Sequence, residues 1–294
     1  MVINSPTNSQ RYILIAPTRD EEKFLENSLK CFVSQSVLPT ELVIVNDGST
    51  DRTGEIADSY AEQYPWIHVV HREDRGMRKV GGGVVDAFYA GYEAIRSSDY
   101  AYICKIDGDV TFQQDYFENL MRKFEENPEL GGASGKTWNP VGGKLLEERM
   151  MDEMVAGQVN FWRRECWESA GGFVREVMWD GIIFHRARML GWKTCSFPDE
   201  DLKIIHHRLM GSSDSSVYKG RLRWGRGQWF MGTHPLYILA SGIFRMRERP
   251  YIIGGLLIVA GYVKACFQGM RRYEDIEFRK SLHAWQLKRL GVKR

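Results

Sequence analysis

The chain has few cysteines, and their distribution argues against two common ways of stabilising a fold. Its 294 residues include five cysteines, an odd number, scattered at positions 31, 104, 166, 195 and 266. No Cys-x-x-Cys pair occurs, so the sequence indicates neither a disulfide framework nor a zinc site. Cysteines within apolar runs are typical of buried thiols in a reducing compartment. We therefore expect a cytoplasmic protein.

The sequence also lacks an apolar run long enough to cross a membrane. Its longest runs cover residues 236–244 and 251–263, whereas a spanning helix needs roughly 20 apolar residues. Runs of this length fit a buried helix or a helix that lies at a membrane surface. Residues 1–10 are polar and have no apolar signal core, so we expect a flexible N-terminus and no secretion.

A net charge of +2 conceals an uneven distribution. Residues 219–294 hold 16 Lys and Arg against 4 Asp and Glu, a net of +12, while the rest holds 24 against 34, a net of −10. The basic, partly apolar end predicts peripheral contact with the anionic inner face of a membrane. The alternative is a pair of C-terminal helices packed on the main domain, with solvated charges. An acidic body without a recognisable RNA or DNA module argues against nucleic acid.

Short apolar runs alternate with amphipathic ones in the first two thirds of the chain. We expect strands at 11–17, 41–46, 67–71, 100–106 and 131–137, with helices near 18–33, 52–63, 84–95 and 115–126. Thr18 or Asp20 is the expected cap of the first helix. The alternation predicts an α/β fold with a mostly parallel, Rossmann-like sheet covered by helices. This catalytic domain would span 11–215, followed by a helical region at 216–294.

Three polar clusters fall where predicted strands end, at 18–21, 47–51 and 107–109. Ligands of parallel sheets bind beyond the carboxyl ends of the strands. Asp107 and Asp109 are hard oxygen donors that suit Mg²⁺ or Mn²⁺, which in turn holds a diphosphate. Gly108 between them permits close approach of a ligand. Each cluster alone is also consistent with turn or helix-cap chemistry.

Three segments together give a more specific indication. Pro-Thr-Arg-Asp-Glu at 17–21, Val-Ile-Val-Asn-Asp-Gly-Ser-Thr-Asp at 43–51 and Lys-Ile-Asp-Gly-Asp at 105–109 resemble the nucleotide-sugar half of family-2 inverting glycosyltransferases with the GT-A fold. The resemblance implies a UDP- or GDP-linked sugar donor and a divalent metal. It places a donor half at 11–137 and an acceptor half at 138–215. The implied donor-site residues are Pro17, Thr18, Arg19, Glu21, Asp47, Ser49, Asp107, Gly108 and Asp109.

The resemblance also implies individual roles. Asp47 would contact the base, Asp107 the ribose or the metal, and Asp109 the metal directly. Family members often carry a third acidic residue after this pair, where this chain has Val110. The glycine-rich stretch 75–83 departs further from the family pattern. Its Arg78 and Lys79 are candidates to hold phosphate at a helix start, although the stretch also fits a flexible loop.

The acceptor half offers a candidate general base. Where the family has a Glu-Asp pair, this chain has Trp179-Asp180, so the resemblance assigns Asp180 to take the proton of the acceptor hydroxyl. Asp180 also fits a helix cap, and Glu176 is the alternative base. Trp179 would either stack on a sugar ring or pack in the core.

Two further motifs complete the predicted site. His206 or His207 follows a short apolar segment and is a candidate third metal ligand, or a structural residue. Arg223-Trp224 matches part of the acceptor-binding motif of polymerising relatives, although the preceding glutamine is missing. Residues 211–216 have the composition of a loop that closes over the donor.

The sequence thus predicts a metal-dependent inverting glycosyltransferase that acts on a glycan or a lipid-linked acceptor. A catalytically silent scaffold with the same fold is one alternative. A sugar nucleotidyltransferase is the other, and it should show a glycine-rich signature after the first strand, where this chain has Pro17-Thr18-Arg19.

Overall fold

A computed structural model describes residues 10–76, 81–208 and 216–292. The predicted flexible N-terminus, apart from Gln10, lies outside the described residues. So do Arg78, Lys79 and residues 211–215 of the predicted donor-closing loop.

A seven-stranded sheet forms the centre of the protein, in the order β10-β6-β9-β4-β1-β2-β3. All neighbouring strands run parallel except β9, which is antiparallel to both β4 and β6. The predicted α/β fold with a mostly parallel sheet is therefore confirmed. The strands are β1 (Tyr12–Thr18), β2 (Glu41–Asp47), β3 (Ile67–Arg72), β4 (Tyr102–Ile106), β6 (Leu130–Gly135), β9 (Val159–Arg163) and β10 (Lys193–Phe197).

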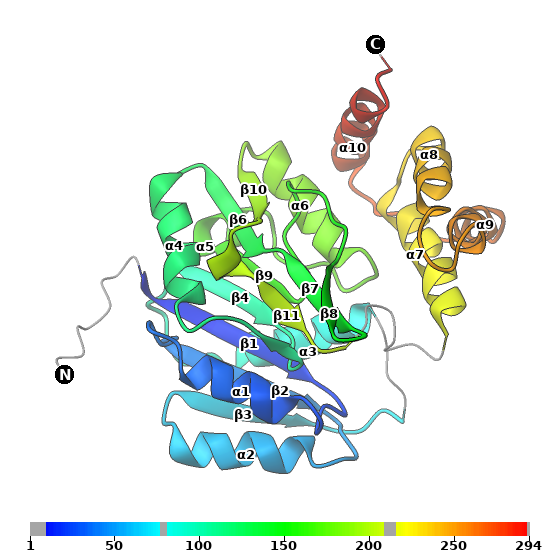
Figure 1. The fold of residues 1–294 in the computed structure, drawn as a ribbon. Helices are drawn as coiled ribbons and strands as arrows, with labels where there is room; N and C mark the ends of the chain where they lie inside the picture. Colours follow the sequence, from blue (N-terminus) through cyan, green and yellow to red (C-terminus); the bar gives the residue numbers. More distant parts are fainter. Residues whose placement is uncertain (1–9, 77–80, 209–215, 293–294) are drawn as a thin grey trace.

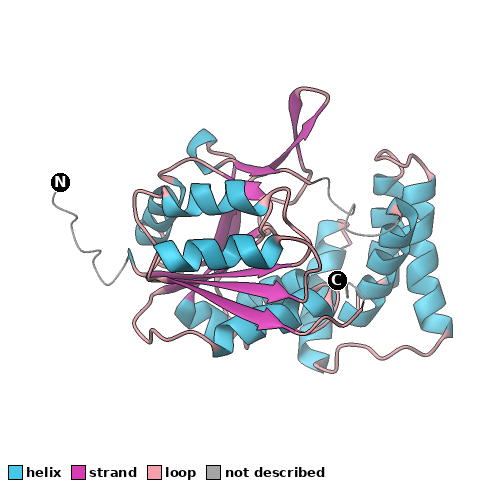
Figure 2. Ribbon diagram, turned by 90° about the horizontal axis from the view of Figure 1, so that it is seen from below, coloured by secondary structure: helices cyan, strands magenta, loops and turns pink. Residues whose placement is uncertain are grey.

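Helices cover both faces of this sheet (Figures 1 and 2). Side chains alternate along a strand, so Tyr12 and Leu14 of β1 enter one core while Ile13 and Ile15 enter the other. The first core is closed by α1 (Leu25–Val33), α2 (Thr53–Gln63) and α4 (Tyr116–Glu126). The second is closed by α3 (Gly82–Glu93), α5 (Arg164–Ser169) and α6 (Trp179–Met189).

A second, four-stranded sheet was not predicted. It has the order β5-β11-β7-β8, with β5 (Val110–Thr111), β7 (Thr137–Val141), β8 (Lys144–Glu147) and β11 (Ile204–His206). The single strand expected at 131–137 is wrong, because the chain changes partner at Lys136. The N–H of Lys136 donates to Phe197 at the edge of the main sheet, and its carbonyl accepts from Ile204, which begins β11 after the 3₁₀ turn η2 (Glu200–Leu202).

The predicted cap of the first helix is also wrong. The helix α1 begins at Leu25, and no side chain caps it. Asp20 lies in the preceding loop with a positive φ of 53°. Its carboxylate accepts a 3.0 Å hydrogen bond from the N–H of Thr50, so this residue ties together the loops that follow β1 and β2.

Four helices form the C-terminal region, on one side of the sheet domain in Figure 1. They are α7 (Val217–Met231), α8 (Pro235–Arg245), α9 (Ile253–Phe267) and α10 (Ile276–Arg289). A small core shared by Ile182 of α6, Phe230 of α7 and Phe278 of α10 joins them to the main domain. Among the described residues, no helix has the length and apolarity needed to cross a bilayer.

Candidate active site

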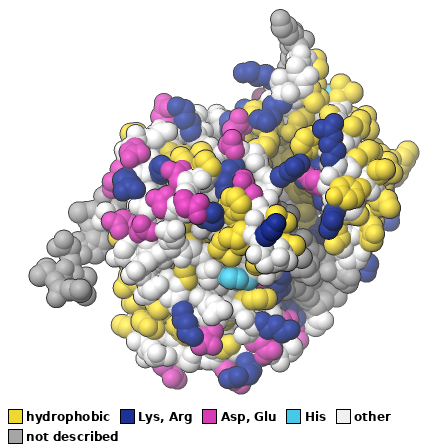
Figure 3. Space-filling model, in the orientation of Figure 1, with side chains coloured by type: hydrophobic (Ala, Val, Ile, Leu, Met, Phe, Trp, Pro, Cys, Tyr) yellow, Lys and Arg dark blue, Asp and Glu magenta, His cyan; other side chains and the backbone are white. Residues whose placement is uncertain are grey.

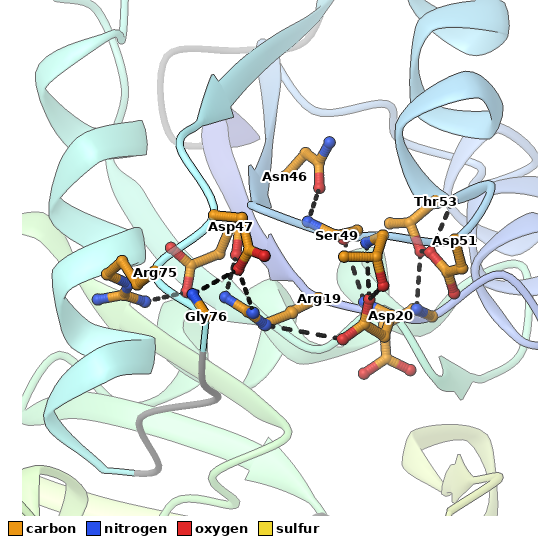
Figure 4. A network of polar contacts seen from close by, with 12 residues as sticks. Arg19, Asp20, Asn46, Asp47, Ser49, Asp51, Thr53, Arg75 and Gly76 are labelled. Atoms are coloured by element: carbon orange, nitrogen blue, oxygen red, sulfur yellow. Dashed lines mark hydrogen bonds and ion pairs between the residues drawn. The ribbon is translucent and has the colours of Figure 1, made fainter.

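The loops after β1 and β2 form one side of the site (Figure 4). Thr18 ends β1, and its hydroxyl donates to the carbonyl of Val45 at 3.1 Å. The buried Arg19 donates to the carbonyl of Asp47 at 2.8 Å and pairs with Asp74 at 2.6 Å. Ser49 accepts from the N–H of Asp20 at 3.1 Å. The first two predicted clusters therefore meet at one edge, as the parallel register requires.

Asp47 lies buried at the end of β2 between two arginines. One carboxylate oxygen accepts from Arg72 at 2.7 Å, and the other pairs with Arg75. Arg75 also lies 4.0 Å from Asp86 of α3. This arrangement combines a hydrogen-bond acceptor with adjacent cations, which is a chemistry suited to a nucleotide.

The third cluster follows β4 on the same edge. Gly108 lies so close to β1 that a Cβ there would approach the Thr18 side chain to 2.9 Å, so glycine is needed for this close packing. The carboxylate of Asp107 pairs with Lys105. Asp109 is buried, and its Oδ1 has no hydrogen-bond partner among the described residues.

His206 lies opposite Asp109, with its Nε2 3.5 Å from Asp109 Oδ2. Burial alone would lower the pKa of His206 and raise the pKa of Asp109. The hydrogen bond and the opposite charges of the pair outweigh burial, so the pKa of His206 is raised and the pKa of Asp109 is lowered. The charge of Arg208 also lowers the pKa of Asp109. His207 differs, since its ring bonds the Thr111 hydroxyl at 2.9 Å. His206 is thus the histidine that the structure brings to the carboxylates.

The predicted three-residue metal set is not assembled. Within the part of the chain that the structure describes, no three His, Cys, Asp or Glu side chains are grouped to hold a metal, and the carboxylate of Asp107 pairs with Lys105. Asp109 and His206 still fit a divalent cation, since the buried Oδ1 of Asp109 has no partner. Mg²⁺ and Mn²⁺ sites commonly use few protein ligands and complete the shell with phosphate oxygens and water.

Asp180 lies in the first turn of α6. The helix begins at Trp179, and its N-cap is Met178 in a left-handed conformation, so the helix-cap interpretation of Asp180 is wrong. Asp180 Oδ1 accepts from the N–H of Gly181 at 2.8 Å. Desolvation raises the pKa of its carboxyl above the ordinary value of 3.8, with Lys105 acting in the opposite direction.

The side chain of Trp179 supports packing, and not sugar stacking. Its ring is 8% exposed and lies 4.7 Å from the Phe173 ring, centre to centre. The Lys105 ammonium lies 5.6 Å above it. We therefore assign Trp179 to the core behind the base.

Three site residues were missed by the sequence analysis. Lys105 donates to Asp107 and to the carbonyl of Gly157 at 2.9 Å, and its charge acts on Asp180. The sequence feature that could have identified Lys105 is a lysine within an otherwise apolar strand. Arg208 pairs with Glu21 and lies 3.4 Å from Asp109, a contact without a sequence signal.

Glu148, just after β8, is the third. Desolvation raises the pKa of its carboxyl, and His206 and Arg245 act against that rise. Gln158 donates to it at 3.4 Å. Its segment has no distinctive sequence pattern, and only the second sheet places it beside His206.

The predicted acceptor residues Arg223 and Trp224 lie on α7. Trp224 packs in a small cluster of the C-terminal helices, and the guanidinium of Arg245 lies 4.0 Å above its ring. Arg245 also exerts its charge on Glu148. Trp224 is therefore linked to the site through one arginine of α8.

We expect catalysis to fail on the acid side at a higher pH than for an ordinary aspartate. If Asp180 takes a proton, only its ionised form is active, and its raised pKa means that protonation occurs above pH 3.8. The pH profile of kcat at saturating donor should therefore fall through an apparent pKa above 3.8. An acid limb at or below 3.8 would contradict this assignment.

The fold is that of a GT-A-type domain. The chain belongs to glycosyl transferase family 2, whose sequence profile matches residues 13–180. The predicted family and the predicted enzyme class are thereby confirmed, and the protein is a glycosyltransferase.

Comparison with individual proteins agrees with this assignment. The chain is 21% identical over 230 residues to poly-beta-1,6-N-acetyl-D-glucosamine synthase of Staphylococcus epidermidis, covering 71% of this chain and 52% of the synthase. The chain spans about half the length of this synthase and about a third of the length of two other relatives. It spans 15% of the length of a further relative.

Solved structures share the fold. The mannosyltransferase PcManGT of Pyrobaculum calidifontis, in complex with GDP-Man and Mn²⁺, has a TM-score of 0.59 at 17% identity, over 90% of each chain. TarS 1–349 of S. aureus with UDP-GlcNAc has a TM-score of 0.54 at 14% identity, over 92% of this chain and 78% of that one.

Proposed function

We propose that this protein transfers a sugar from a UDP- or GDP-linked donor to a hydroxyl of a glycan or lipid-linked acceptor, with inversion and with Mn²⁺ or Mg²⁺. The observation that carries the proposal is the position of Asp47 at the end of β2 and of Asp109 just beyond the end of β4 in one sheet, with Asp109 Oδ1 buried and without a partner among the described residues. The relatives support the donor and the acceptor parts of this proposal, since PcManGT binds GDP-Man, TarS binds UDP-GlcNAc, and the synthase is named for a glycan product.

The donor side of the site has separate places for the base and the diphosphate. Asp47 accepts hydrogen bonds from the base, and Arg72 and Arg75, which now neutralise it, lie beside the path of the ribose and diphosphate. Asp109 and His206 would hold the metal, and Asp107 would contact the ribose or the metal. When bound, the metal neutralises the negative charge that grows on the departing diphosphate.

The acceptor side is organised around Asp180. Its carboxylate takes the proton of the acceptor hydroxyl as the oxygen attacks the anomeric carbon from the face opposite the diphosphate. The ammonium of Lys105 is held by a hydrogen bond to the carbonyl of Gly157. Its positive charge favours the ionised carboxylate of Asp180. We assign Glu148, which accepts from Gln158 at 3.4 Å, to a second hydroxyl of the acceptor.

Thermal shift with UDP, GDP and other nucleotides, each with and without Mn²⁺, tests the donor site. We expect one nucleotide to raise the unfolding temperature only when metal is present, because the metal joins the diphosphate to Asp109. This result would also identify the base. No shift with any nucleotide would contradict the donor site and favour the silent scaffold.

A further inference from the structure

The C-terminal helices expose an unusually apolar surface. On α8 the exposed residues include Leu236, Leu239 and Ile243, and on α9 they recur every three or four positions. Figure 3 shows hydrophobic side chains gathered over this region, with Lys and Arg among them. We define the α8–α9 face as Leu236, Leu239, Ile243, Ile253, Leu256, Ala260, Val263 and Phe267. The Phe267 side chain is 87% exposed.

Glycines bring the two helices together as antiparallel neighbours. A Cβ on Gly255 would lie 2.1 Å from the Gly242 carbonyl oxygen, so both backbones are in direct contact there. At the open end of the pair, the Tyr262 hydroxyl donates to the Thr233 carbonyl at 2.7 Å. On a different face α9 packs on α7, where a Cβ on Gly261 would lie 2.2 Å from the Leu222 carbonyl oxygen.

This packing places both exposed stripes on one side. Each residue rotates the position around a helix by about 100°. Counted from the contact glycines Gly242 and Gly255, the exposed stripe of each helix lies about a quarter turn away, and in the same rotational sense on both helices. In an antiparallel pair, that geometry turns both stripes to the side opposite α7. The result is one broad apolar surface and not two separate ridges.

Cations lie around this surface. Arg247 continues the outer flank of α8, Arg249 lies in the connection between the helices, and Lys264 lies on the outer flank of α9. None of the three forms an ion pair within the described residues. The connection also exposes Tyr251 and Ile252, at 59% and 60%. An apolar face with a cationic margin complements the acyl boundary and the phosphates of an anionic membrane.

Two observations favour a membrane over a second copy of the chain. Self-association through this face would bring the same arginines and lysine of two copies together, which like charges oppose. The helix α9 has 15 residues and so measures about 22 Å, short of the roughly 30 Å apolar core of a bilayer. The helices are therefore suited to lie in the membrane surface.

We propose that the α8–α9 face docks on anionic phospholipid and presents lipid-linked acceptor to the active site. Ile243 is exposed on α8, while Arg245, two residues later, is directed inward, with its guanidinium 4.0 Å above the ring of Trp224, a predicted acceptor residue. One helical turn thus connects the membrane face to this predicted acceptor residue. Only the presentation of a lipid-linked acceptor rests on the proposed function; the membrane docking does not.

Vesicle flotation of the full chain tests the docking surface without donor or acceptor, so its failure is distinguishable from failure of the transferase assignment. We expect binding to vesicles of phosphatidylcholine mixed with phosphatidylglycerol, and weak binding to phosphatidylcholine alone. The double variant Ile243→Glu/Phe267→Glu should bind about tenfold or more weakly, since both side chains are exposed and apolar. The matched control is Leu190→Glu, a 54% exposed leucine after α6, which should bind like wild type.

A second variant tests the charges. Arg247→Gln/Lys264→Gln should weaken binding to the mixed vesicles by about fivefold per charge at low salt, while Arg226→Gln on α7 should not. Absent vesicle binding, or equal binding by the Ile243→Glu/Phe267→Glu variant with wild-type circular dichroism, would overturn the proposal. So would a dimer in sedimentation that the same variant dissociates, because the face would then be a self-association interface.

Discussion

Replacing Asp180 by asparagine is expected to abolish most transfer and to leave donor binding unchanged. Asparagine keeps the shape and the oxygen that accepts from the N–H of Gly181, but it has no basicity. General-base catalysis contributes typically ~10²–10⁴-fold, so kcat should fall by about that factor. The Kd of the donor nucleotide should stay within about twofold, because Asp180 lies on the acceptor side of Lys105. Steady-state kinetics and calorimetry measure the two quantities.

Glu176 provides the control for this experiment, because it is the other carboxylate near the start of α6. It lies 3.5 Å from Arg271, in a surface ion pair of the kind that contributes little to stability. Glu176→Gln should therefore retain nearly full kcat. If Glu176→Gln is inactive and Asp180→Asn is active, the base is Glu176 and the alignment with the family's Glu-Asp pair has been misread.

Replacing Asp109 by asparagine is expected to remove the metal dependence of donor binding. Asp109 offers the one site carboxylate oxygen that is buried and without a partner among the described residues, so a cation gains most there. Even outer-shell changes weaken metal sites about 10- to 100-fold, and loss of a charged ligand should weaken Mn²⁺-dependent nucleotide affinity at least as much. Calorimetry with Mn²⁺ and with EDTA should give similar, weak affinities for this variant.

Asp152 is a suitable control for the loss of a negative charge. It is 87% exposed and pairs with Lys136 away from the site, so Asp152→Asn should bind donor like wild type. Circular dichroism must show that Asp109→Asn folds, because Asp109 also contacts His206 and Arg208. A folded Asp109→Asn variant with wild-type affinity in Mn²⁺ would refute Asp109 as the metal ligand.

The sequence predicted the parts of this protein that depend on local pattern. Alternating strands and helices determined the α/β class, since period-2 and period-3.6 patterns are read within a few residues. The same reasoning located the ends of β1, β2 and β4 and therefore the sheet edge that holds the clusters at 18–21, 47–51 and 107–109. It failed where the chain changes partner, as at Lys136, because strand pairing depends on distant segments.

Contacts between distant residues were decided only by the tertiary structure. The pairing of Arg208 with Glu21 joins residues 187 positions apart, and no local pattern contains it. Lys105 pairs with Asp107, a predicted metal ligand, and also donates to the carbonyl of Gly157, 52 positions along the chain. The packing of Trp179 likewise depends on a contact outside its own helix, since its ring lies 4.7 Å from the Phe173 ring, centre to centre.

The C-terminal region shows the same division. By itself the sequence determined that the region is basic, that its apolar runs are too short to span a bilayer, and that it forms helices. Only the tertiary structure decided that Gly242 and Gly255 bring α8 and α9 into contact and turn their apolar stripes to one side. Composition and periodicity are properties of a segment, whereas the direction of a face is fixed by the neighbours against which the segment packs.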